Sequence, residues 1–252
     1  MGLQFAPIVP VKYNPAQLTN YHLVLAHQIV QDLHYREYYC SLGEEHTVIL
    51  DNSVIELGYI DLGLVQLALQ AFIDFRFSGK LILVAPDVLK DSAGTLHMHK
   101  EFLSQPQIFN LVSSGTISIM VIPQGVDDLD VLKCLTSIFE SVDISIDYIG
   151  IPRLTEDFEG GRQNIFEICK WLIEDRKVHL LGIQHNLQEL EWAIDIPNII
   201  GVDSSLPLRA TMAEMNALDI ENLREVPDLD IFDTQLRKKL DMNVKVIQKY
   251  LS

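Results

Sequence analysis

The chain has 252 residues, 48% of them hydrophobic, and a formal net charge of -16 at pH 7. A chain of this size can bury a full core and shows no linker-like segment, so we expect a single domain over residues 1–252. The negative charge argues against strong non-specific binding to a polyanion, because phosphate backbones favour clustered Lys and Arg and this chain carries only 19 of them.

From the sequence we expect neither a membrane span nor a secretion signal. The longest apolar runs are the length of strands, and the first residues lack the basic start and long apolar core of a secretion signal. Cys40, Cys134 and Cys169 are widely spaced in apolar surroundings, which is typical of free thiols in a reducing compartment. We therefore expect a cytoplasmic protein, in the host cytoplasm if a phage encodes it.

The first 40 residues predict a strand and a helix. Residues 5–11 form the expected strand, whose two prolines suit a barrel rim or an edge. Leu18, Tyr21, Leu25, Ile29 and Leu33 fall at helical spacing and predict an amphipathic helix from about residue 15. His22 and His27 would lie in that helix as solvated or interfacial residues. The aromatic segment 35–40 is ambiguous between a strand and a helix end.

Three later apolar strands each finish on a carboxylate. They end at Asp51, Asp87 and Asp203, and the intervening chain alternates between helical and strand patterns. The expected helices are 62–75, 91–103, 128–139, 163–175 and 187–193, and further strands are expected at 117–122, 144–149 and 178–181.

Repeated strand and helix units with short connections imply parallel strands and right-handed crossovers. Seven strands are clear. With the aromatic segment or one undetected strand, eight would close a (β/α)8 barrel of the TIM type; an open doubly wound sheet is the alternative. In such a barrel the carboxyl ends of the strands meet at one mouth, so we expect Asp51, Asp87, Gln124, Gly150 and Asp203 to line one pocket there.

The end of the chain predicts an acidic loop at 225–230 and a last helix at about 232–251. Its apolar stripe is bordered by five basic residues, which are the best candidates for a nucleic-acid contact, although a solvated face is the alternative. These residues are Arg237, Lys238, Lys239, Lys245 and Lys249.

Polar residues collect at the predicted strand ends. A single strand-end Asp is more often a helix cap or turn former than a catalyst, but several in one barrel favour a site. Carboxylates in a desolvated pocket have their pKa values pushed apart, so that one acts as acid or base while another is an ionised nucleophile. An Asp beside a Gln also suits a purine edge. The candidates are Asp51, Asn52, Ser53, Asp87, Gln124, Gly125, Gly150, Arg153, Gln184, Asp203, Ser204 and Arg209.

The succession of motifs resembles the tRNA-guanine transglycosylase superfamily, and most closely its short phage members, which exchange guanine in DNA for a 7-deazaguanine base. The similarity covers about residues 47–209. The motifs are, in order, Asp51-Asn52-Ser53, Asp87, Pro123-Gln124-Gly125, Gly150-Ile151-Pro152, Gly182 and Gly201-Val202-Asp203.

The resemblance implies a base exchange through a covalent glycosyl-aspartate. Asp203 would be the nucleophile and Asp51 the acid/base. Asp87 and Gln124 would recognise the heterocycle, and the Gly150 backbone would contact its carbonyl. Further substrate contacts are expected from Asn52, Ser53, Gly125, Arg153, Gln184 and Arg209. The implied partners are a nucleic acid, with DNA favoured over tRNA, a 7-deazapurine base, and either a second copy of the chain or an accessory nucleic-acid-binding subunit. No cofactor is implied.

Two features depart from the family. Its usual Asp-Ser-Gly-Gly-Phe is here Asp51-Asn52-Ser53-Val54-Ile55, and the cysteine and histidine cluster that holds zinc in the tRNA enzymes has no counterpart. His97 and His99 form an isolated pair that we expect on a helix surface, so no structural zinc is predicted. Two alternatives remain open: a hydrolase of a base or nucleoside N-glycosidic bond, and a non-catalytic base-binding subunit on the same fold.

Overall fold

The computed structural model describes residues 2–183, 187–218 and 234–252. Its centre is one parallel sheet of eight strands in the order β1-β8-β7-β6-β5-β4-β3-β2. The strands are β1 Gln4–Pro7, β2 Tyr21–Leu25, β3 Thr47–Asp51, β4 Lys80–Val84, β5 Ser118–Val121, β6 Tyr148–Pro152, β7 Lys177–Leu181 and β8 Ile199–Ser204.

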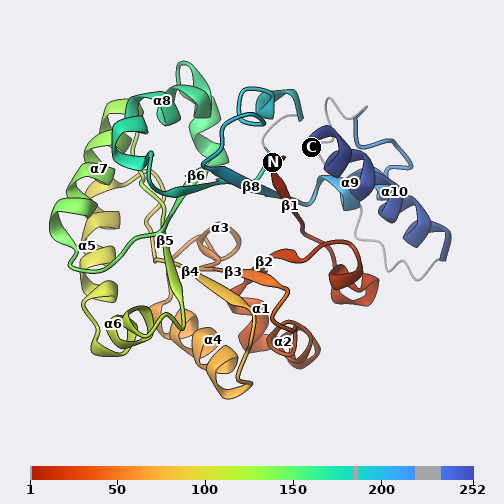
Figure 1. Cartoon of the computed structure of the whole chain (residues 1–252), viewed down its shortest axis with the longest axis horizontal. Helices are drawn as coiled ribbons and strands as arrows, with labels where there is room; N and C mark the ends of the chain where they lie inside the picture. Colours follow the sequence, from red (N-terminus) through yellow and green to blue (C-terminus); the bar gives the residue numbers. More distant parts are fainter. Residues whose placement is uncertain (1, 184–186, 219–233) are drawn as a thin grey trace.

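The sheet curls into a nearly closed barrel with helices around it (Figure 1). Strands β1 and β2 lie against each other at the seam but are not neighbours in the hydrogen-bonded order. The predicted (β/α)8 TIM-type barrel is therefore confirmed, and the open doubly wound sheet is excluded.

Helices follow most of the strands and cover the outside of the barrel. Asp61, Asp91 and Asp127 each cap a helix, because a side-chain oxygen accepts a hydrogen bond from a backbone N–H of the first turn. The helices are α1 Ala26–Gln31, α2 Leu33–Cys40, α3 Val54–Leu57, α4 Leu62–Asp74, α5 Ser92–Leu103, α6 Pro106–Ser113, α7 Asp128–Ser141, α8 Gly161–Ile173, α9 Leu206–Met212 and α10 Thr234–Tyr250. Short 3-10 turns lie at Val11–Tyr13, Pro15–Gln17, Arg153–Asp157 and Leu187–Leu190.

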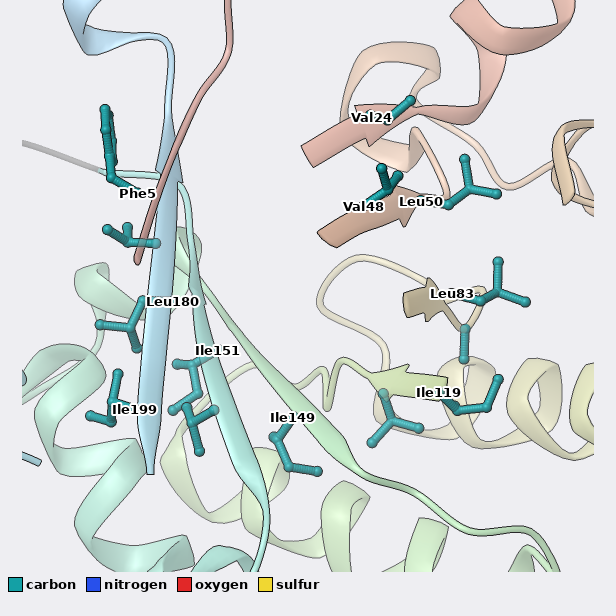
Figure 2. Close-up of a cluster of buried hydrophobic side chains, with 14 of the residues drawn as sticks. Phe5, Val24, Val48, Leu50, Leu83, Ile119, Ile149, Ile151, Leu180 and Ile199 are labelled. Carbon is teal, nitrogen blue, oxygen red and sulfur yellow. The ribbon is translucent and has the colours of Figure 1, made fainter. Parts of the chain in front are cut away.

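Alternation along the strands produces two cores. Side chains such as Val48, Leu50 and Leu83 point outward and pack under the helices (Figure 2). Their neighbours Ile49 and Ile82 belong to a second cluster that fills the barrel interior. Because both faces of each strand are covered, the strands read as continuous apolar runs in the sequence.

The sequence-based prediction was wrong at the eighth strand, at 187–193, where a 3-10 turn at Leu187–Leu190 replaces the expected helix, and at 5–11, where the strand ends at Pro7. Residues 21–25, expected within a helix, form β2 and pair in parallel with β3, so His22 lies in a strand. The aromatic segment forms α2 instead. Helical spacing of Leu18, Tyr21 and Leu25 is also compatible with a strand buried on both faces, and pairing with β3 decides between the two.

Other predictions have mixed outcomes. The last helix is confirmed as α10, whereas the acidic loop at 225–230 lies outside the described residues. The cysteines are free and buried, as expected. His99 corrects an expectation, because it is fully buried on the inward face of α5 while His97, in the same helix, is exposed. Within the described part of the chain, no helix is long and apolar enough to cross a membrane.

Candidate active site at the barrel mouth

A cavity of about 620 Å³ opens at the carboxyl ends of the strands. Asp51 at the end of β3, Asp87 after β4, Gln124 after β5 and Asp203 near the end of β8 all line it. The predicted convergence on one pocket is confirmed for these four residues, but not for Gly150, which is not among the residues lining the cavity. Other predicted site residues in its wall are Asn52, Arg153, Ser204 and Arg209.

Three predicted site residues lie outside the wall of the cavity. Ser53 is buried behind it, and its hydroxyl accepts a hydrogen bond from the His27 N–H at 3.3 Å. Gly125 packs on the start of α7, where an added Cβ would come within 2.6 Å of the Val131 nitrogen. Gly150 faces the barrel interior, with Leu181 and Ile122 against the position of a Cβ. Gln184 lies outside the described residues.

Asp51 is the most perturbed acid of the cavity. Burial raises the pKa of its carboxyl to about 8, and the negative charges of Glu56, Asp87 and Asp203 add to the rise. The Ser53 N–H, which donates to Asp51 Oδ2 at 2.8 Å, opposes the rise. At neutral pH the Asp51 carboxyl is therefore mainly protonated and able to donate a proton.

The turn after Asp51 is strained. Ser53 adopts φ 64°, a left-handed conformation that few residues other than glycine adopt. This geometry brings the Ser53 N–H back onto Asp51 and the Val54 N–H onto Asn52 Oδ1, at 3.0 Å. Strain of this kind is often found at functional sites, where the surrounding structure holds it in place.

Asp87 is held by two amide side chains. Asn52 Nδ2 donates to Asp87 Oδ1 at 2.5 Å, and Gln124 Nε2 donates to Oδ2 at 2.6 Å. Backbone N–H groups of Val54 and Lys90 donate to the two amide oxygens, so both amide groups must present their NH2 to Asp87. Burial raises the pKa of Asp87 to about 6 although the two amide hydrogen bonds lower it.

One carboxylate oxygen of Asp203 is held by hydrogen bonds. Its Oδ1 accepts from His179 Nε2 and from the Gly182 N–H, both at 3.0 Å. The other nitrogen of His179, Nδ1, lies 2.8 Å from the hydroxyl of Tyr21. The Gly182 N–H donates, so Oδ1 acts as a hydrogen-bond acceptor.

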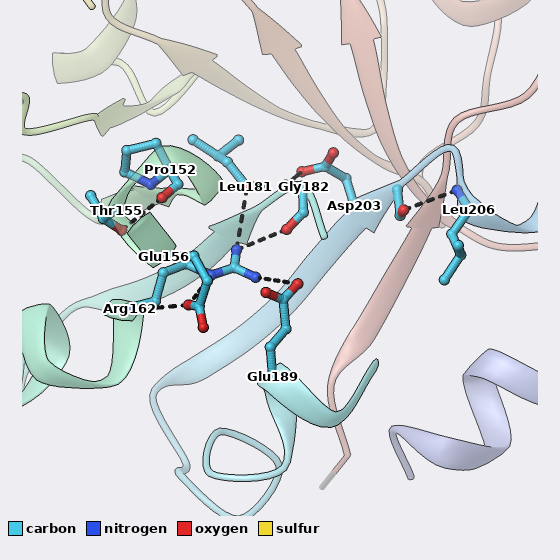
Figure 3. Close-up of polar contacts among 10 residues, drawn as sticks. Pro152, Thr155, Glu156, Arg162, Leu181, Gly182, Glu189, Asp203 and Leu206 are labelled. Atoms are coloured by element: carbon cyan, nitrogen blue, oxygen red, sulfur yellow. Dashed lines mark hydrogen bonds and ion pairs between the residues drawn. The ribbon is translucent and has the colours of Figure 1, made fainter. Parts of the chain in front are cut away.

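A buried arginine supports the loop that carries Gly182 (Figure 3). Arg162 Nη1 donates to the carbonyl oxygens of Leu181 at 3.3 Å and Gly182 at 2.8 Å. Its guanidinium also forms ion pairs with Glu189 at 3.0 Å and Glu156 at 3.8 Å. The end of β7 is thereby held where Gly182, at φ 69°, turns its N–H toward Asp203.

Charge in the cavity wall is mixed. Arg153 and Arg209 line it together with Glu56 and the three aspartates. Guanidinium groups bind carboxylates and phosphates well, so the two arginines suit a ligand with an anionic group. In the described part of the chain no cluster of three or more His, Cys, Asp or Glu side chains is arranged to hold a metal ion.

Several residues around the site were not predicted. His179 lies in the strand predicted at 178–181. It is the one polar side chain of that segment, and this was the available signal. Tyr21 was assigned to a helix, so its inward direction could not be foreseen. Glu56 and Arg162 carried no local signal, since their roles depend on contacts with other segments.

Comparisons with known proteins bear mainly on the fold. No family model matches the chain, and no curated protein does. A solved structure of a monomeric dihydrodipicolinate synthase variant covers 100% of this chain, and 97% of that chain is covered, with TM-score 0.50 and 12% identity. The Ruminococcus gnavus sialic acid aldolase covers 91% of this chain and 98% of its own, with TM-score 0.49 and 11% identity.

The similarity to the synthase establishes the barrel alone. At 12% identity it carries no activity over to this chain.

The structural comparison corrects the predicted base exchange. The solved structure that matches this fold with TM-score 0.50 is described as a dihydrodipicolinate synthase variant and not as a transglycosylase. The motifs behind the prediction were short acid, amide and glycine signals at strand ends, and such residues can gather at the mouth of any barrel of this kind. The transglycosylase function is therefore withdrawn. The expected nucleic-acid, 7-deazapurine and subunit partners stay untested predictions.

Proposed function

We propose that this chain is an enzyme that catalyses proton transfer at carbon in a small carbonyl compound bearing an anionic group. The observation that carries the proposal is the pairing of two unlike acids in one cavity. Asp51 has a pKa raised to about 8 and is a proton donor at neutral pH, whereas Asp203 is held as a hydrogen-bond acceptor by His179 and Gly182. Carboxyl groups with contrasting environments are the usual basis of paired acid and base roles.

The chemical step follows from these roles. Asp203 accepts the proton from the carbon next to the carbonyl, and the electron pair of that C–H bond forms a carbon–carbon double bond. The carbonyl π electrons move to the oxygen, which takes the proton of the Asp51 carboxyl and becomes an enol hydroxyl. The step leaves Asp203 protonated and Asp51 ionised, and the reverse transfers restore both.

The cavity supports a small substrate. Its volume of about 620 Å³ lies within the usual range of small-molecule sites, roughly 300–1,000 Å³. Apolar side chains such as Leu25, Ile122 and Leu181 line it beside the acids, and Arg153 and Arg209 suit a carboxylate or phosphate on the ligand.

An aldolase that forms a Schiff base is less well supported. That chemistry needs a lysine amine at the reacting carbonyl, and none of the described residues lining the cavity is a lysine. Carbon–carbon cleavage at this site would have to proceed through the two carboxyl groups.

The test is exchange of hydrogen for deuterium. The protein is incubated in D2O with a panel of small oxo acids and phosphorylated ketones, and loss of the C–H signal next to each carbonyl is followed by NMR. Asp203→Asn should reduce exchange by about 100-fold or more, the usual contribution of a general base. Asp74→Asn, at an exposed helix position, is the control. Exchange that persists in Asp203→Asn, or a ligand that binds the cavity without exchange, would overturn the proposal.

A further inference from the structure

Asp203 is connected to two side chains that lie wholly inside the barrel. His179 on β7 is completely buried, and Tyr21 on β2 is 1% exposed. The contacts Tyr21 Oη to His179 Nδ1, 2.8 Å, and His179 Nε2 to Asp203 Oδ1, 3.0 Å, form a line across the interior. The direction of the hydrogen bonds along this line can be worked out from its two ends.

The positions of the protons follow from what each atom can do. A carboxylate only accepts hydrogen bonds, so His179 Nε2 must carry a proton and donate to Asp203. With the ring proton on Nε2, Nδ1 is an acceptor, and Tyr21 donates its hydroxyl proton to it. Tyr21 keeps that proton, because burial raises its pKa well above the usual range and the charges of Tyr148 and Asp203 add to the rise.

The backbone leaves room for this arrangement. At Gly201 on β8 an added Cβ would lie 2.7 Å from Tyr21 Cε1, so the tyrosine ring passes where a side chain would stand. The rings of Tyr21 and His179 are 5.6 Å apart between centroids and tilted by 51°. Tyr21 thus reaches across the seam from β2 to β8 and β7.

We propose that His179 and Tyr21 are positioning residues for Asp203: they hold its Oδ1 so that Oδ2 is the oxygen presented to the substrate. The inference rests on the proposed role of Asp203 as the base. Within the described part of the chain, both hydrogen bonds of the Asp203 carboxylate fall on Oδ1, and Asp203 lines the cavity, which leaves Oδ2 as the oxygen offered to a ligand. The Tyr21 hydroxyl, by donating to Nδ1, favours the tautomer in which His179 Nε2 carries the proton and donates to Asp203. A histidine without a partner on Nδ1 would lack this preference.

Holding a base in one orientation affects the rate more than binding. Displacing a catalytic group by about an ångström can cost about 100-fold in rate. Since neither His179 nor Tyr21 is among the residues lining the cavity, their loss should leave ligand contacts intact. The expected signature is a fall in kcat with little change in KM.

The first test needs no substrate. In the full chain labelled with 15N-histidine, NMR should place the His179 proton on Nε2 with Nδ1 unprotonated. Tyr21→Phe should shift the Nδ1 resonance, because it removes the hydrogen bond while keeping the ring. Tyr38→Phe is the matched control, since its hydroxyl bonds Asn14 and Ala16 far from the line. A proton on Nδ1, or an Nδ1 resonance unchanged in Tyr21→Phe, would overturn the inference.

The second test uses the deuterium-exchange assay with the ligand that the wild type processes. His179→Leu should lower kcat by about 100-fold with KM within about threefold, and His179→Gln, which keeps an N–H at the same place, should recover most of the loss. A His179→Leu variant as active as the wild type, or a His179→Gln variant as impaired as His179→Leu, would contradict the positioning role. If His179→Leu does not fold, the same comparison is made between Tyr21→Phe and Tyr38→Phe, with kcat lowered only in the former.

Failure of the proposed function leaves a different pattern. If no ligand undergoes exchange, the base role of Asp203 loses its support, but crystal structures of the His179→Leu and His179→Gln variants still test the positioning. The carboxylate should rotate in the former and keep its wild-type orientation in the latter. An unrotated carboxylate in His179→Leu would overturn the positioning role itself.

Discussion

At the scale of single residues, the environment of each carboxyl group decides what it can do. Asp51, Asp87 and Asp203 are the same side chain in one cavity, yet they differ in partners. Asp51 has one backbone N–H and negative neighbours, Asp87 has two amide donors, and Asp203 has an imidazole and a backbone N–H. Their differences support an acid, an anchored group and a base within a single site.

The raised pKa of Asp51 predicts a dependence of stability on pH. The folded carboxyl, with a pKa of about 8, binds more protons than the unfolded one between about pH 4 and 8. The free energy of unfolding should therefore fall as pH rises through this window. Asp51→Asn should remove this part of the slope and raise stability at pH 9 by about 2–4 kcal/mol, with little effect at pH 5.

Urea unfolding of both proteins at pH 5, 7 and 9 measures the effect. Asp74→Asn, which replaces an exposed carboxylate, is the control and should run parallel to the wild type. The smaller slope from Asp87, whose pKa is raised to about 6, should remain between about pH 4 and 6 in all variants. An Asp51→Asn variant that follows the wild-type curve would mean that the carboxyl is not perturbed.

Arg162 offers a second prediction at this scale. It is fully buried, pairs with Glu189 and holds two carbonyl oxygens at the end of β7. Arg162→Met should lower the free energy of unfolding by about 3–5 kcal/mol, because it removes the guanidinium that pairs with the buried Glu189 carboxylate. Adding Glu189→Gln to this variant should recover part of the loss, which denaturant titration of the single and double variants will measure. A single variant that loses less than about 1 kcal/mol would contradict this account.

At the scale of elements, β8 carries the site and also makes space for it. It places Asp203 at the mouth, and two residues earlier Gly201 lets the ring of Tyr21 cross from β2. Strands β1 and β2 are not hydrogen-bonded neighbours at the seam, and the Tyr21 side chain thus connects β2 to β8 and β7 through the barrel interior.

Gly201→Ala should destabilise the fold by about 1–3 kcal/mol. The added Cβ would lie 2.7 Å from Tyr21 Cε1 and 2.8 Å from the Gln4 carbonyl oxygen, and backbone cannot yield as a flexible side chain does. Gly63→Ala is the control, because Gly63 is exposed within α4 and a Cβ there meets nothing closer than 3.4 Å. That change should stabilise the protein by about 0.5–1 kcal/mol. Equal thermal unfolding temperatures for Gly201→Ala and the wild type would refute the close approach.

At the scale of the whole molecule, the reactivity of the three cysteines measures whether the helices around the barrel stay packed. Cys40 lies in α2, Cys134 in α7 and Cys169 in α8, and all are buried. Burial raises their pKa values to about 12, 11 and 12 respectively, so the reactive thiolate is scarce in the folded protein.

Alkylation at pH 8 should therefore be slow for all three thiols in the native protein and rapid in denaturant. Mass spectrometry after a short pulse of iodoacetamide should show no label without urea and three labels above the unfolding midpoint. Rates that rise together with urea would indicate that opening of the whole barrel exposes them. Rapid labelling of one cysteine in the native state would show that its helix opens locally.

Element type was predictable wherever the hydrophobic pattern had one interpretation. The pattern of 62–75 corresponds to α4 at Leu62–Asp74, and that of 47–51 corresponds to β3. The prediction of element type failed at Tyr21–Leu25, because a strand that is buried on both faces can also show helical spacing of its apolar residues. The site was predicted to the extent that it lies at strand ends. Gly150 was misplaced, because a glycine has no side chain to indicate its direction, and only the folded strand shows that it faces the barrel interior.

The sequence by itself determined the alternation of strands and helices, the carboxylates at the strand ends and hence their meeting at one mouth, because these depend on local periodicity and on the geometry of parallel sheets. Only the tertiary structure decided which side chains act on those carboxylates. Tyr21 and His179 are 158 positions apart and meet inside the barrel, and Asp51 acquires its raised pKa from burial and from charges on other segments. Such contacts form between distant segments, so no local pattern specifies them, and the electrostatic environment that follows from them exists only once the barrel has closed.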